Sequence, residues 1–195
     1  DDTRERVRAA FARGVPGKLV ESPCNEGFCG GQNRALAASH APWVLFLNPD
    51  ATLPVDFLSR LVNLVATLDP EVGTIAPLIL LADGRIDSSG LFLDRQRRVY
   101  ARGQGEFPPP MLREEDVFGC TGAVALHRRA MLEDVAEDGK ALDERLFAYY
   151  DDLDLSWRAQ LQGWRCRFVP ALVATHGRGG KNALRATERG PGRAF

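Results

Sequence analysis

The chain has 195 residues, 45% of them hydrophobic and 26% charged, and its formal net charge is −1 at pH 7. This length fits one domain with a buried core, and the composition is that of a soluble globular protein. A charge so close to neutral gives no general attraction to nucleic acid, so no nucleic-acid partner is expected. The four cysteines lack CxxC spacing, which argues against a zinc site and suits reduced thiols in a cytosolic protein, while a Cys24–Cys29 disulfide stays open.

The N-terminal part predicts two helices on either side of a glycine-rich loop. Asp2 and Glu5 have the spacing of a capping box and start the first helix. A short strand is expected at Lys18–Val20 and a second helix at Gln32–Ser39. Between them, residues 24–33 (CNEGFCGGQN) carry three glycines, which allow close approach of the backbone to a ligand. The loop matches neither GxGxxG nor GxxxxGK[ST], so it identifies no ligand by itself.

A short apolar strand followed by an acid is the first candidate site. Trp43–Leu47 (WVLFL) is uninterrupted and bounded by prolines, which predicts a strand buried on both faces of a parallel sheet. Asn48-Pro49-Asp50 follows its carboxyl end, where ligands bind in open α/β sheets, so Asp50 is well placed to hold a metal ion. The same three residue types are favoured in turns, and the sequence alone leaves a simple turn equally open.

The middle of the chain predicts core elements. Apolar residues recur with helical spacing in residues 54–70, between two prolines. A strand is expected at Ile75–Leu81, at an edge or with a bulge, because Pro77 cannot donate a ladder hydrogen bond. Residues 84–100 predict a hairpin-like or irregular segment, and residues 104–111, with three consecutive prolines, predict an irregular loop.

Strands and helices alternate again towards the C-terminus. Val117–Leu126 predicts a strand whose two glycines permit a bulge or clear space for a substrate, and Arg129–Val135 predicts a short helix. Two apolar segments, Cys166–Val169 and Ala171–Ala174, predict strands. The second segment runs to His176, a lone histidine that is a candidate ligand, although most lone histidines have no such role.

Three acids open the helix predicted after Tyr150. Asp151 is expected as its N-cap, and Asp152 and Asp154 fall in the first turn, where backbone amides and the helix dipole favour ionised carboxylates. Charged acids beside a tyrosine pair suggest a catalytic site. Ordinary capping chemistry gives the same pattern, and Asp154 has the i,i+4 spacing to Arg158 of a surface ion pair.

Basic residues dominate the C-terminal end. After Arg178, four basic residues follow at four-residue intervals from Lys181 to Arg193. Such a strip is most often a solvated face, and it also suits contact with a diphosphate or an anionic membrane surface.

Five motifs in order resemble those of family-two glycosyltransferases of GT-A fold. They are CNEGFCGGQNRAL (24–36), WVLFLNPD (43–50), FGCTGAVALHRR (118–129), LDERLFAYYDDLDLSWRAQLQGWRCRFVP (142–170) and ATHGRGG (174–180). The rhamnosyltransferase-like branch, which builds bacterial surface and cell-wall polysaccharides, is the most similar. The resemblance implies an α/β fold with a mostly parallel central sheet flanked by helices and a smaller mixed-strand acceptor-side portion. It implies one GT-A-type domain over residues 1–180, N-terminally incomplete because the family's first βαβ portion has no counterpart, and a basic tail over residues 181–195.

The resemblance also assigns roles to individual residues. Asp152 matches the catalytic base, and Asp50 and His176 match the groups that hold Mg²⁺ or Mn²⁺ against the diphosphate. The donor-binding positions are Asn25, Gly31, Asn33 and Asn48, and the acceptor-side positions are Gly122, Asp151 and Trp157. Many members carry an acid where this chain has Asn48, a departure expected to weaken metal affinity.

The implied function is that of an inverting, metal-dependent glycosyltransferase of the hexosyl or rhamnosyl class. Its partners would be a nucleotide-diphosphate sugar donor and a saccharide or lipid-linked acceptor, in the cytoplasm or at the inner face of the membrane, with the basic tail as the membrane contact. The alternative is a catalytically incomplete chain that binds sugar or nucleotide or serves as a scaffold. A DDxxD prenyl transferase or phosphatase fits poorly, because Leu155 stands where that motif needs an acid.

Overall fold

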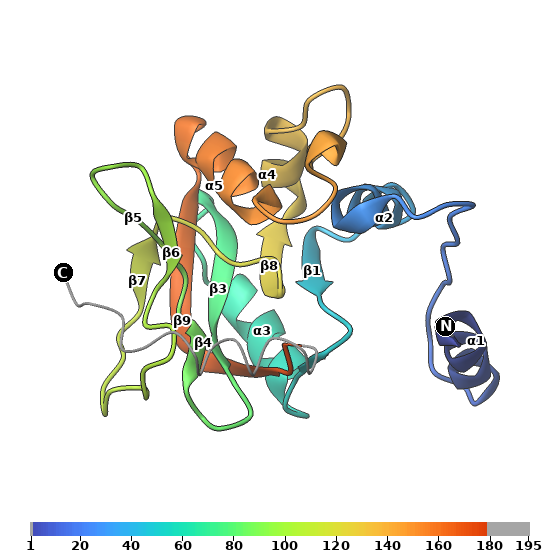
Figure 1. Cartoon of the computed structure of the whole chain (residues 1–195), viewed down its shortest axis with the longest axis horizontal. Coiled ribbons are helices and arrows are strands. Elements are labelled where there is room, and N and C mark those ends of the chain that lie inside the picture. Colours follow the sequence, from blue (N-terminus) through green and yellow to red (C-terminus); the bar gives the residue numbers. More distant parts are fainter. Residues whose placement is uncertain (1, 179–195) are drawn as a thin grey trace.

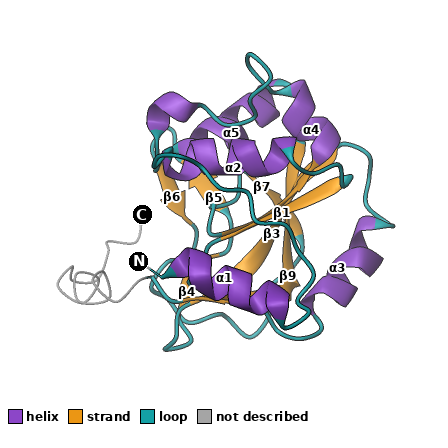
Figure 2. Ribbon diagram, turned by 90° about the vertical axis from the view of Figure 1, so that its right-hand side faces the viewer, coloured by secondary structure: helices purple, strands orange, loops and turns teal. Residues whose placement is uncertain are grey.

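The computed structural model describes residues 2–178, in which helices pack on both faces of a mixed β-sheet (Figure 1). The helices are α1 (Thr3–Ala12), α2 (Gly27–Ala37), α3 (Phe57–Val65), α4 (Arg129–Asp134), the 3-10 helix η1 (Glu144–Leu146) and α5 (Asp151–Leu161). The strands are β1 (Trp43–Leu47), β2 (Ala51–Thr52), β3 (Val72–Leu80), β4 (Ile86–Ser88), β5 (Leu91–Leu93), β6 (Val99–Ala101), β7 (Glu115–Val117), β8 (Val124–Arg128) and β9 (Arg165–His176). Figure 2 shows α2, α4 and α5 grouped on one side of the sheet, with α3 apart from them.

The main sheet has the strand order β1-β8-β3-β9-β2, with β4 pairing to β3 and β7 pairing to β9. Among its strands within residues 2–178, only β3 and β9 run parallel, and the other five pairings are antiparallel. The α/β class is therefore confirmed, while the sheet in this part of the chain is mixed rather than mostly parallel. An apolar run does not reveal strand direction, which depends on the partner that the strand meets.

β1 has the predicted bounds but not the predicted surroundings. It pairs antiparallel with β8 along its whole length, from Trp43 opposite Arg128 to Leu47 opposite Val124. Phe46 is buried, whereas Leu47 is exposed, so the strand is not covered on both faces.

β3 and β9 form the centre of the sheet. β3 is buried along almost its whole length, and β9 is continuous where the sequence predicts two separate strands. The register breaks at Pro77: Pro77 pairs with Val169, but Leu78 pairs with Val173, so residues 170–172 have no partner on β3. The bulge expected from Pro77 is confirmed, because a register break removes the ladder hydrogen bond that proline cannot donate. The edge position is wrong, because β3 lies between β8 and β9.

The glycine-rich segment is more helical than the sequence predicts. Lys18–Val20 forms no strand, and α2 begins at Gly27 rather than at Gln32. Gly27 has φ 70°, and a Cβ there would lie 2.3 Å from the carbonyl oxygen of Phe147, so only glycine fits. Asn25 Oδ1 accepts a hydrogen bond from the Gly27 amide at 3.0 Å and satisfies one free donor at this helix end. The close backbone approach expected of these glycines is thus made to another part of the chain.

The strand expected at Val117–Leu126 is divided in two. β7 ends at Val117 and β8 begins at Val124, and residues 118–123 between them are irregular. The two glycines of this stretch lie in that interval, which confirms that they interrupt the strand. The hairpin-like segment is confirmed as the antiparallel pair β5 and β6, and residues 104–111 contain no helix or strand.

Two groups of apolar side chains fill the two faces of the sheet. The α3-side cluster consists of Phe57, Leu61, Ile75, Ile79, Ala123, Val124, Leu126, Val169, Leu172 and Ala174. The opposite cluster consists of Ala76, Leu78, Ile86, Cys120, Ala125, Cys166 and Phe168.

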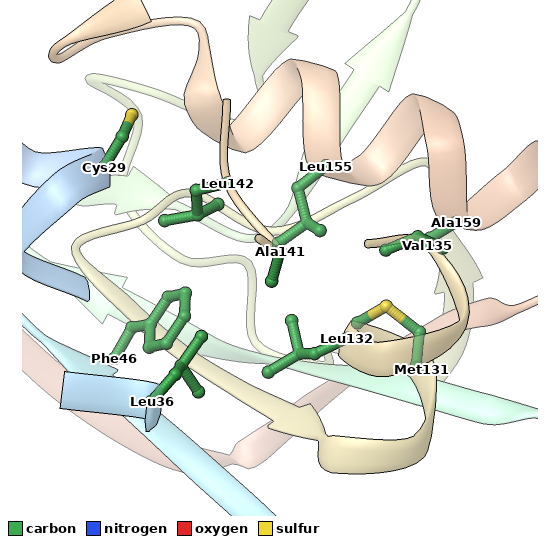
Figure 3. Packing of buried hydrophobic residues seen from close by; sticks show 10 residues of the cluster. All are labelled: Cys29, Leu36, Phe46, Met131, Leu132, Val135, Ala141, Leu142, Leu155 and Ala159. Carbon is green, nitrogen blue, oxygen red and sulfur yellow. The ribbon is translucent and has the colours of Figure 1, made fainter. Parts of the chain in front are cut away.

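A third cluster fixes α5 to its neighbours (Figure 3). Leu155 and Ala159 of α5 pack with Met131 and Leu132 of α4 and with Phe46 of β1. Fully burying a side chain of leucine size stabilises the fold by roughly 1.5–3 kcal/mol. The contacts of Leu155 and Ala159 therefore hold the acidic first turn of α5 in place.

All four cysteines are free thiols, so the Cys24–Cys29 disulfide that the sequence leaves open is not formed. In the part of the chain from residue 2 to residue 178, no helix combines the length and the apolar character needed to cross a membrane. The basic strip from Lys181 to Arg193 lies outside the described residues.

Candidate active site

A strained loop leads into the acids of α5. Phe147, Tyr149 and Tyr150 have φ values of 59°, 70° and 63°. Left-handed backbone costs a residue with a side chain roughly 1–2 kcal/mol. The Cys29 amide donates to the Phe147 carbonyl at 3.2 Å, which fastens the loop to α2. The left-handed turn makes Tyr150 the last residue before the helix, so Asp151 is the first helical residue and its predicted role as N-cap is wrong.

Asp151 and Asp152 are acids held away from solvent without a basic partner. Asp151 is 7% exposed, and burial, aided by the charge of Asp152, raises its pKa from 3.8 to about 6. Burial also raises the pKa of Asp152, although backbone groups oppose it, among them the Leu153 amide that donates to Oδ1 at 2.8 Å. Within residues 2–178, neither acid forms an ion pair with a basic side chain. Burial thus outweighs the backbone hydrogen bonds that favour the ionised carboxylates, and both groups are suited to take up a proton.

Asp154 has a different role although it belongs to the same turn. Its Oδ2 accepts hydrogen bonds from Arg158 Nε at 3.0 Å and Nη2 at 2.7 Å, so the predicted i,i+4 pair is confirmed. Arg158 also donates to the carbonyl oxygens of Val135 and Ala141. This pair ties α5 to the segment that follows α4.

A small cavity lies behind the acid pair. Its walls are formed by Phe46, Thr74, Cys120, Gly122, His127, Leu142, Asp151, Asp152, Leu155 and Ser156. Burial lowers the pKa of His127 to about 3, so its ring is neutral, and its Nδ1 lies 3.0 Å from Thr74 Oγ1. A Cβ at Gly122 would lie 3.3 Å from Asp151 Oδ2, so the missing side chain leaves room beside that carboxyl group. The structure therefore brings Gly122, Asp151 and Asp152 together.

Trp157, the third predicted acceptor-side residue, lies in the second turn of α5. Its ring packs edge-on against Phe118, with 5.8 Å between the ring centroids. Phe118 belongs to the irregular segment that also carries Gly122, but neither aromatic ring lines the small cavity.

The turn after β1 connects this region with a second group of polar residues. The Asn48 amide donates to the Ala123 carbonyl at 2.9 Å, and the Ala51 amide donates to the Asn48 carbonyl at 3.0 Å. The turn places Asp50 beside His176, with 3.2 Å between Oδ1 and Nε2. The turn and the site, which the sequence leaves as alternatives, are therefore compatible.

Gly122, Asn48, Asp50 and His176 gather at one edge of the sheet. Leu47 at the end of β1 pairs with Val124 at the start of β8, and Leu80 at the end of β3 pairs with Thr175 near the end of β9. The carboxyl ends of β1, β3 and β9 therefore share an edge with the start of β8. Ligands of open α/β sheets bind outside the carboxyl ends of the strands.

Asp87 of β4 completes the second group, and the sequence reasoning missed it. It is 3% exposed; its Oδ2 lies 2.7 Å from His176 Nδ1, and its Oδ1 pairs with the Arg178 guanidinium. Burial alone would raise the pKa of Asp87, but the His176 hydrogen bond and the Arg178 charge outweigh it and lower this pKa. The same hydrogen bond, which Asp87 accepts, raises the pKa of His176. The sequence around Asp87 has no periodic pattern, so only the folded structure reveals the contact.

The residues predicted to bind the donor are divided among several positions. Asn25 satisfies an amide at the start of α2, and Gly31 is exposed on that helix with open space around it. Asn33 uses its side-chain amide on another part of the chain: Nδ2 donates to the Leu142 carbonyl at 2.8 Å, and Oδ1 accepts from the Leu142 amide at 3.0 Å. Asn48 is the one that the structure places next to Asp50.

The protein-family model described as "Glycosyltransferase like family 2" matches residues 1–192. The chain belongs to this family. The curated relatives include the N-acetylglucosaminyl-diphospho-decaprenol L-rhamnosyltransferase of Mycobacterium tuberculosis, 27% identical over 87% of this chain and 61% of that protein. The pre-mycofactocin glycosyltransferase of the same organism is 27% identical over 82% of this chain and 32% of that protein. The chain thus spans about three fifths of the length of the first relative.

Solved structures show the fold of this family-two chain to be GT-A. The mannosyltransferase PcManGT from Pyrobaculum calidifontis, solved with GDP-Man and Mn²⁺, matches with a TM-score of 0.64 at 19% identity, over 96% of this chain and 48% of that one. GalNAc-T7, solved with UDP, GalNAc and Mn²⁺, matches with a TM-score of 0.66 at 13% identity, over 89% of this chain and 34% of that one. At these identities the likeness concerns the fold alone.

The side chains near Asp50 allow a test of whether a divalent cation fits. Asp50 and His176 offer one carboxylate oxygen and one imidazole nitrogen 3.2 Å apart, a separation that suits two neighbouring ligands of one cation. Within residues 2–178, no group of three or more His, Cys, Asp or Glu side chains is arranged to hold a metal ion by itself. Cations such as Mg²⁺ are often held by one or two carboxylates together with substrate phosphates and water. The residues therefore fit a cation that takes its other ligands from a diphosphate and water.

Proposed function

We propose that this chain is the catalytic part of an inverting glycosyltransferase. It transfers a sugar from a nucleotide-diphosphate donor to a hydroxyl group of a saccharide or lipid-linked acceptor. The observation that carries the proposal is the shared sheet edge, where the Asn48–Ala123 hydrogen bond joins the turn bearing Asp50 to the segment beside the α5 acids. On one side of this edge the acids of α5 would take a proton, and on the other side Asp50 and His176 would hold the diphosphate through a cation.

Asp152 is the proposed catalytic base. It is less buried than Asp151, its pKa is raised by burial, and the Leu153 amide fixes one of its oxygens. A positioned carboxylate that takes the proton of the attacking hydroxyl typically accelerates a reaction ~10²- to 10⁴-fold. Asp151 and Gly122 form the adjoining wall, and with Trp157 they are the proposed acceptor side. A direct attack assisted by one base inverts the anomeric carbon.

Asp50 and His176 are the proposed anchors of the diphosphate end. The backbone holds them together, because Ala51 pairs with His176 and the Gly177 amide donates to the Asp50 carbonyl at 2.8 Å. Mg²⁺ or Mn²⁺ bound there would stabilise the charge that develops on the departing diphosphate. Asn25, Gly31 and Asn48 are the proposed lining of the donor pocket. Asn33, through its two bonds to Leu142, positions α2 against the loop that leads to the acids.

The relatives suggest the substrate class. One carries the name of a rhamnosyltransferase with a diphospho-decaprenol acceptor, and the two solved structures contain nucleotide or nucleotide-sugar ligands with Mn²⁺. We therefore propose rhamnosyl or hexosyl transfer to a lipid-linked saccharide in bacterial surface or cell-wall polysaccharide synthesis, at the inner face of the membrane. The basic tail is the proposed contact with anionic lipid.

A sugar-transfer assay tests the proposal against its alternative, a module that binds sugar or nucleotide without turnover. The chain is incubated with a lipid-linked saccharide acceptor, with nucleotide sugars that include L-rhamnose donors and GDP-mannose, and with Mn²⁺ or EDTA, and the released nucleoside diphosphate and the glycosylated acceptor are measured. The proposal expects release that depends on the cation. Nucleotide binding in a thermal-shift titration with no release from any donor would favour the alternative.

A further inference from the structure

We infer that Asp87 is a positioning residue that holds the His176 ring and the Arg178 guanidinium in place at the diphosphate end of the site. This inference rests on the proposed function, because it concerns how the anchors of that site are oriented. Asp87 itself lies on the far side of His176 from Asp50, since the two carboxyl groups contact different nitrogens of the same ring.

The burial of Asp87 shows that its two partners are needed. Its side chain is 4% exposed, and all three residues of β4 are buried. A carboxylate removed from water is costly unless charged or hydrogen-bonded partners compensate. Here the compensation comes from the His176 ring and the Arg178 guanidinium, which reach Asp87 from the end of β9 and the residues just after it. Each group therefore restricts the positions of the other two.

The contact with Asp87 decides which ring nitrogen of His176 faces the ligand. An ionised carboxylate only accepts hydrogen bonds, so His176 Nδ1 must carry the proton that it donates to Asp87. The other nitrogen, Nε2, is then the atom directed at Asp50. When a divalent cation binds, Nε2 provides its lone pair and any proton on it passes to solvent. Carboxylate, histidine and metal in this order form an arrangement that fixes the tautomer and the ring orientation.

Arg178 gives the same carboxylate a second function. The backbone of Arg178 has φ 46°, in the left-handed region, and its side chain turns back to Asp87, which lies 91 residues earlier in the chain. The guanidinium is thereby kept beside the proposed diphosphate end, where a fixed positive charge favours a polyanionic ligand. A change at Asp87 should therefore affect cation binding and diphosphate binding together.

The test uses the variants Asp87→Ala and Asp87→Asn, with Asp116→Asn as the matched control. Asp116 also pairs with two arginines, Arg165 and Arg167, but it lies on β7 and has no contact with His176 among the contacts of residues 2–178. Mn²⁺ affinity in the presence of GDP or UDP is measured by isothermal titration calorimetry. Loss of such a partner typically weakens metal affinity about 10- to 100-fold. We expect that loss for Asp87→Ala, a smaller one for Asp87→Asn, and none for the control.

The ring nitrogens provide a readout that needs neither metal nor activity. At a pH high enough for the His176 ring to be neutral, long-range ¹H–¹⁵N correlation spectra should show its Nδ1–H form in the unchanged chain and in Asp87→Asn, whose side-chain oxygen can still accept. In Asp87→Ala the proton should move to Nε2. Unchanged spectra and unchanged Mn²⁺ affinity in both variants would overturn the inference. Where Asp87→Ala does not fold, Asp87→Asn decides: Mn²⁺ affinity equal to that of the control overturns the inference, and weaker affinity supports it.

The two proposals fail in different ways. A chain that transfers sugar normally when Asp87 is replaced contradicts the inference and leaves the proposed function intact. A chain that transfers no sugar, but whose His176 tautomer depends on Asp87, contradicts the proposed function and leaves the inference intact.

Discussion

Asp151 and Asp87 are buried to a similar degree and behave in opposite ways. Their exposed fractions are 7% and 3%. Burial raises the pKa of Asp151 to about 6, whereas the His176 hydrogen bond and the Arg178 charge overcome burial and lower the pKa of Asp87. Partners, rather than depth, decide the chemistry of a buried acid. An acid without a basic partner suits proton transfer, and an acid held by a histidine and an arginine stays anionic and orients them.

The largest effect is expected for the proposed base. Asp152→Asn keeps the shape of the side chain but cannot accept the proton, so sugar transfer should fall about 10²- to 10⁴-fold. Initial rates with a competent donor provide the measurement. Asp154→Asn is the control, because Asp154 belongs to the same turn but pairs with Arg158. Near-normal turnover of Asp152→Asn would remove Asp152 from the mechanism and would leave the unpartnered acids of α5 without a role in proton transfer.

The next effect concerns the partnered side. Asp50→Ala removes the carboxylate that faces His176, so binding of a nucleoside diphosphate in the presence of Mn²⁺ should weaken by about 10-fold or more. Calorimetric titration with and without Mn²⁺ measures this change. Asp83→Ala, which alters an exposed acid in the turn before β4, should bind normally. Equal affinity for Asp50→Ala and the control in Mn²⁺ would contradict the assignment of Asp50.

A smaller effect, on the free energy of unfolding, tests whether the ionised form of Asp151 is destabilised by burial without a basic partner. A raised pKa means that the folded state binds the proton more tightly than the unfolded state, so this group lowers stability as the pH rises from about 4 to about 6. Asp151→Asn removes that loss and should increase the free energy of unfolding by about 1–3 kcal/mol at pH 7.5, with less gain at pH 4. Urea unfolding across this range measures it. A difference that does not vary with pH would show that Asp151 is not held in this way.

The smallest effect is expected for the partnered acid of α5. Asp154→Asn loses a partly exposed pair with Arg158, which is worth about 1 kcal/mol or less. Urea unfolding should detect a small loss that decreases in high salt, because salt screens such pairs. A loss of several kcal/mol would mean that Arg158 depends on Asp154 to keep its bonds to Val135 and Ala141.

Local sequence patterns account for much of this site. The run of Trp43–Leu47 between prolines gave the bounds of β1, and the turn residues after it correctly marked a turn that also carries an acid. The acids of α5 were recognised because a helix start concentrates them, and the i,i+4 spacing identified the partner of Asp154. Each of these features depends on residues close together in the chain.

What the sequence did not reveal depends on distant contacts. Asp87 and His176 are 89 residues apart, and Asn33 and Leu142 are 109 residues apart, so no short motif contains either pair. The direction of strand pairing and the raised pKa of Asp151 also depend on what lies across the fold, because burial is a property of neighbours. The family resemblance named Asp50, Asp152 and His176 as site residues but gave no sign of Asp87, which contacts His176.

The register break in β9 determines which face of the sheet His176 belongs to. Before the break, Cys166 and Phe168 pack in the opposite cluster; after it, Leu172 and Ala174 pack in the α3-side cluster. All four have even numbers, so the two faces of the strand exchange at the break. Side chains of a strand alternate between faces, and an odd number of extra residues produces this exchange.

The number of extra residues at the register break therefore determines the face to which His176 points. Residues 170–172 are three additional positions on β9, and deletion of one of them would turn the ring to the other face, away from Asp50, while every residue of the site remained unchanged. A length variant in this segment would thus separate His176 from Asp50 as effectively as replacing one of the two side chains.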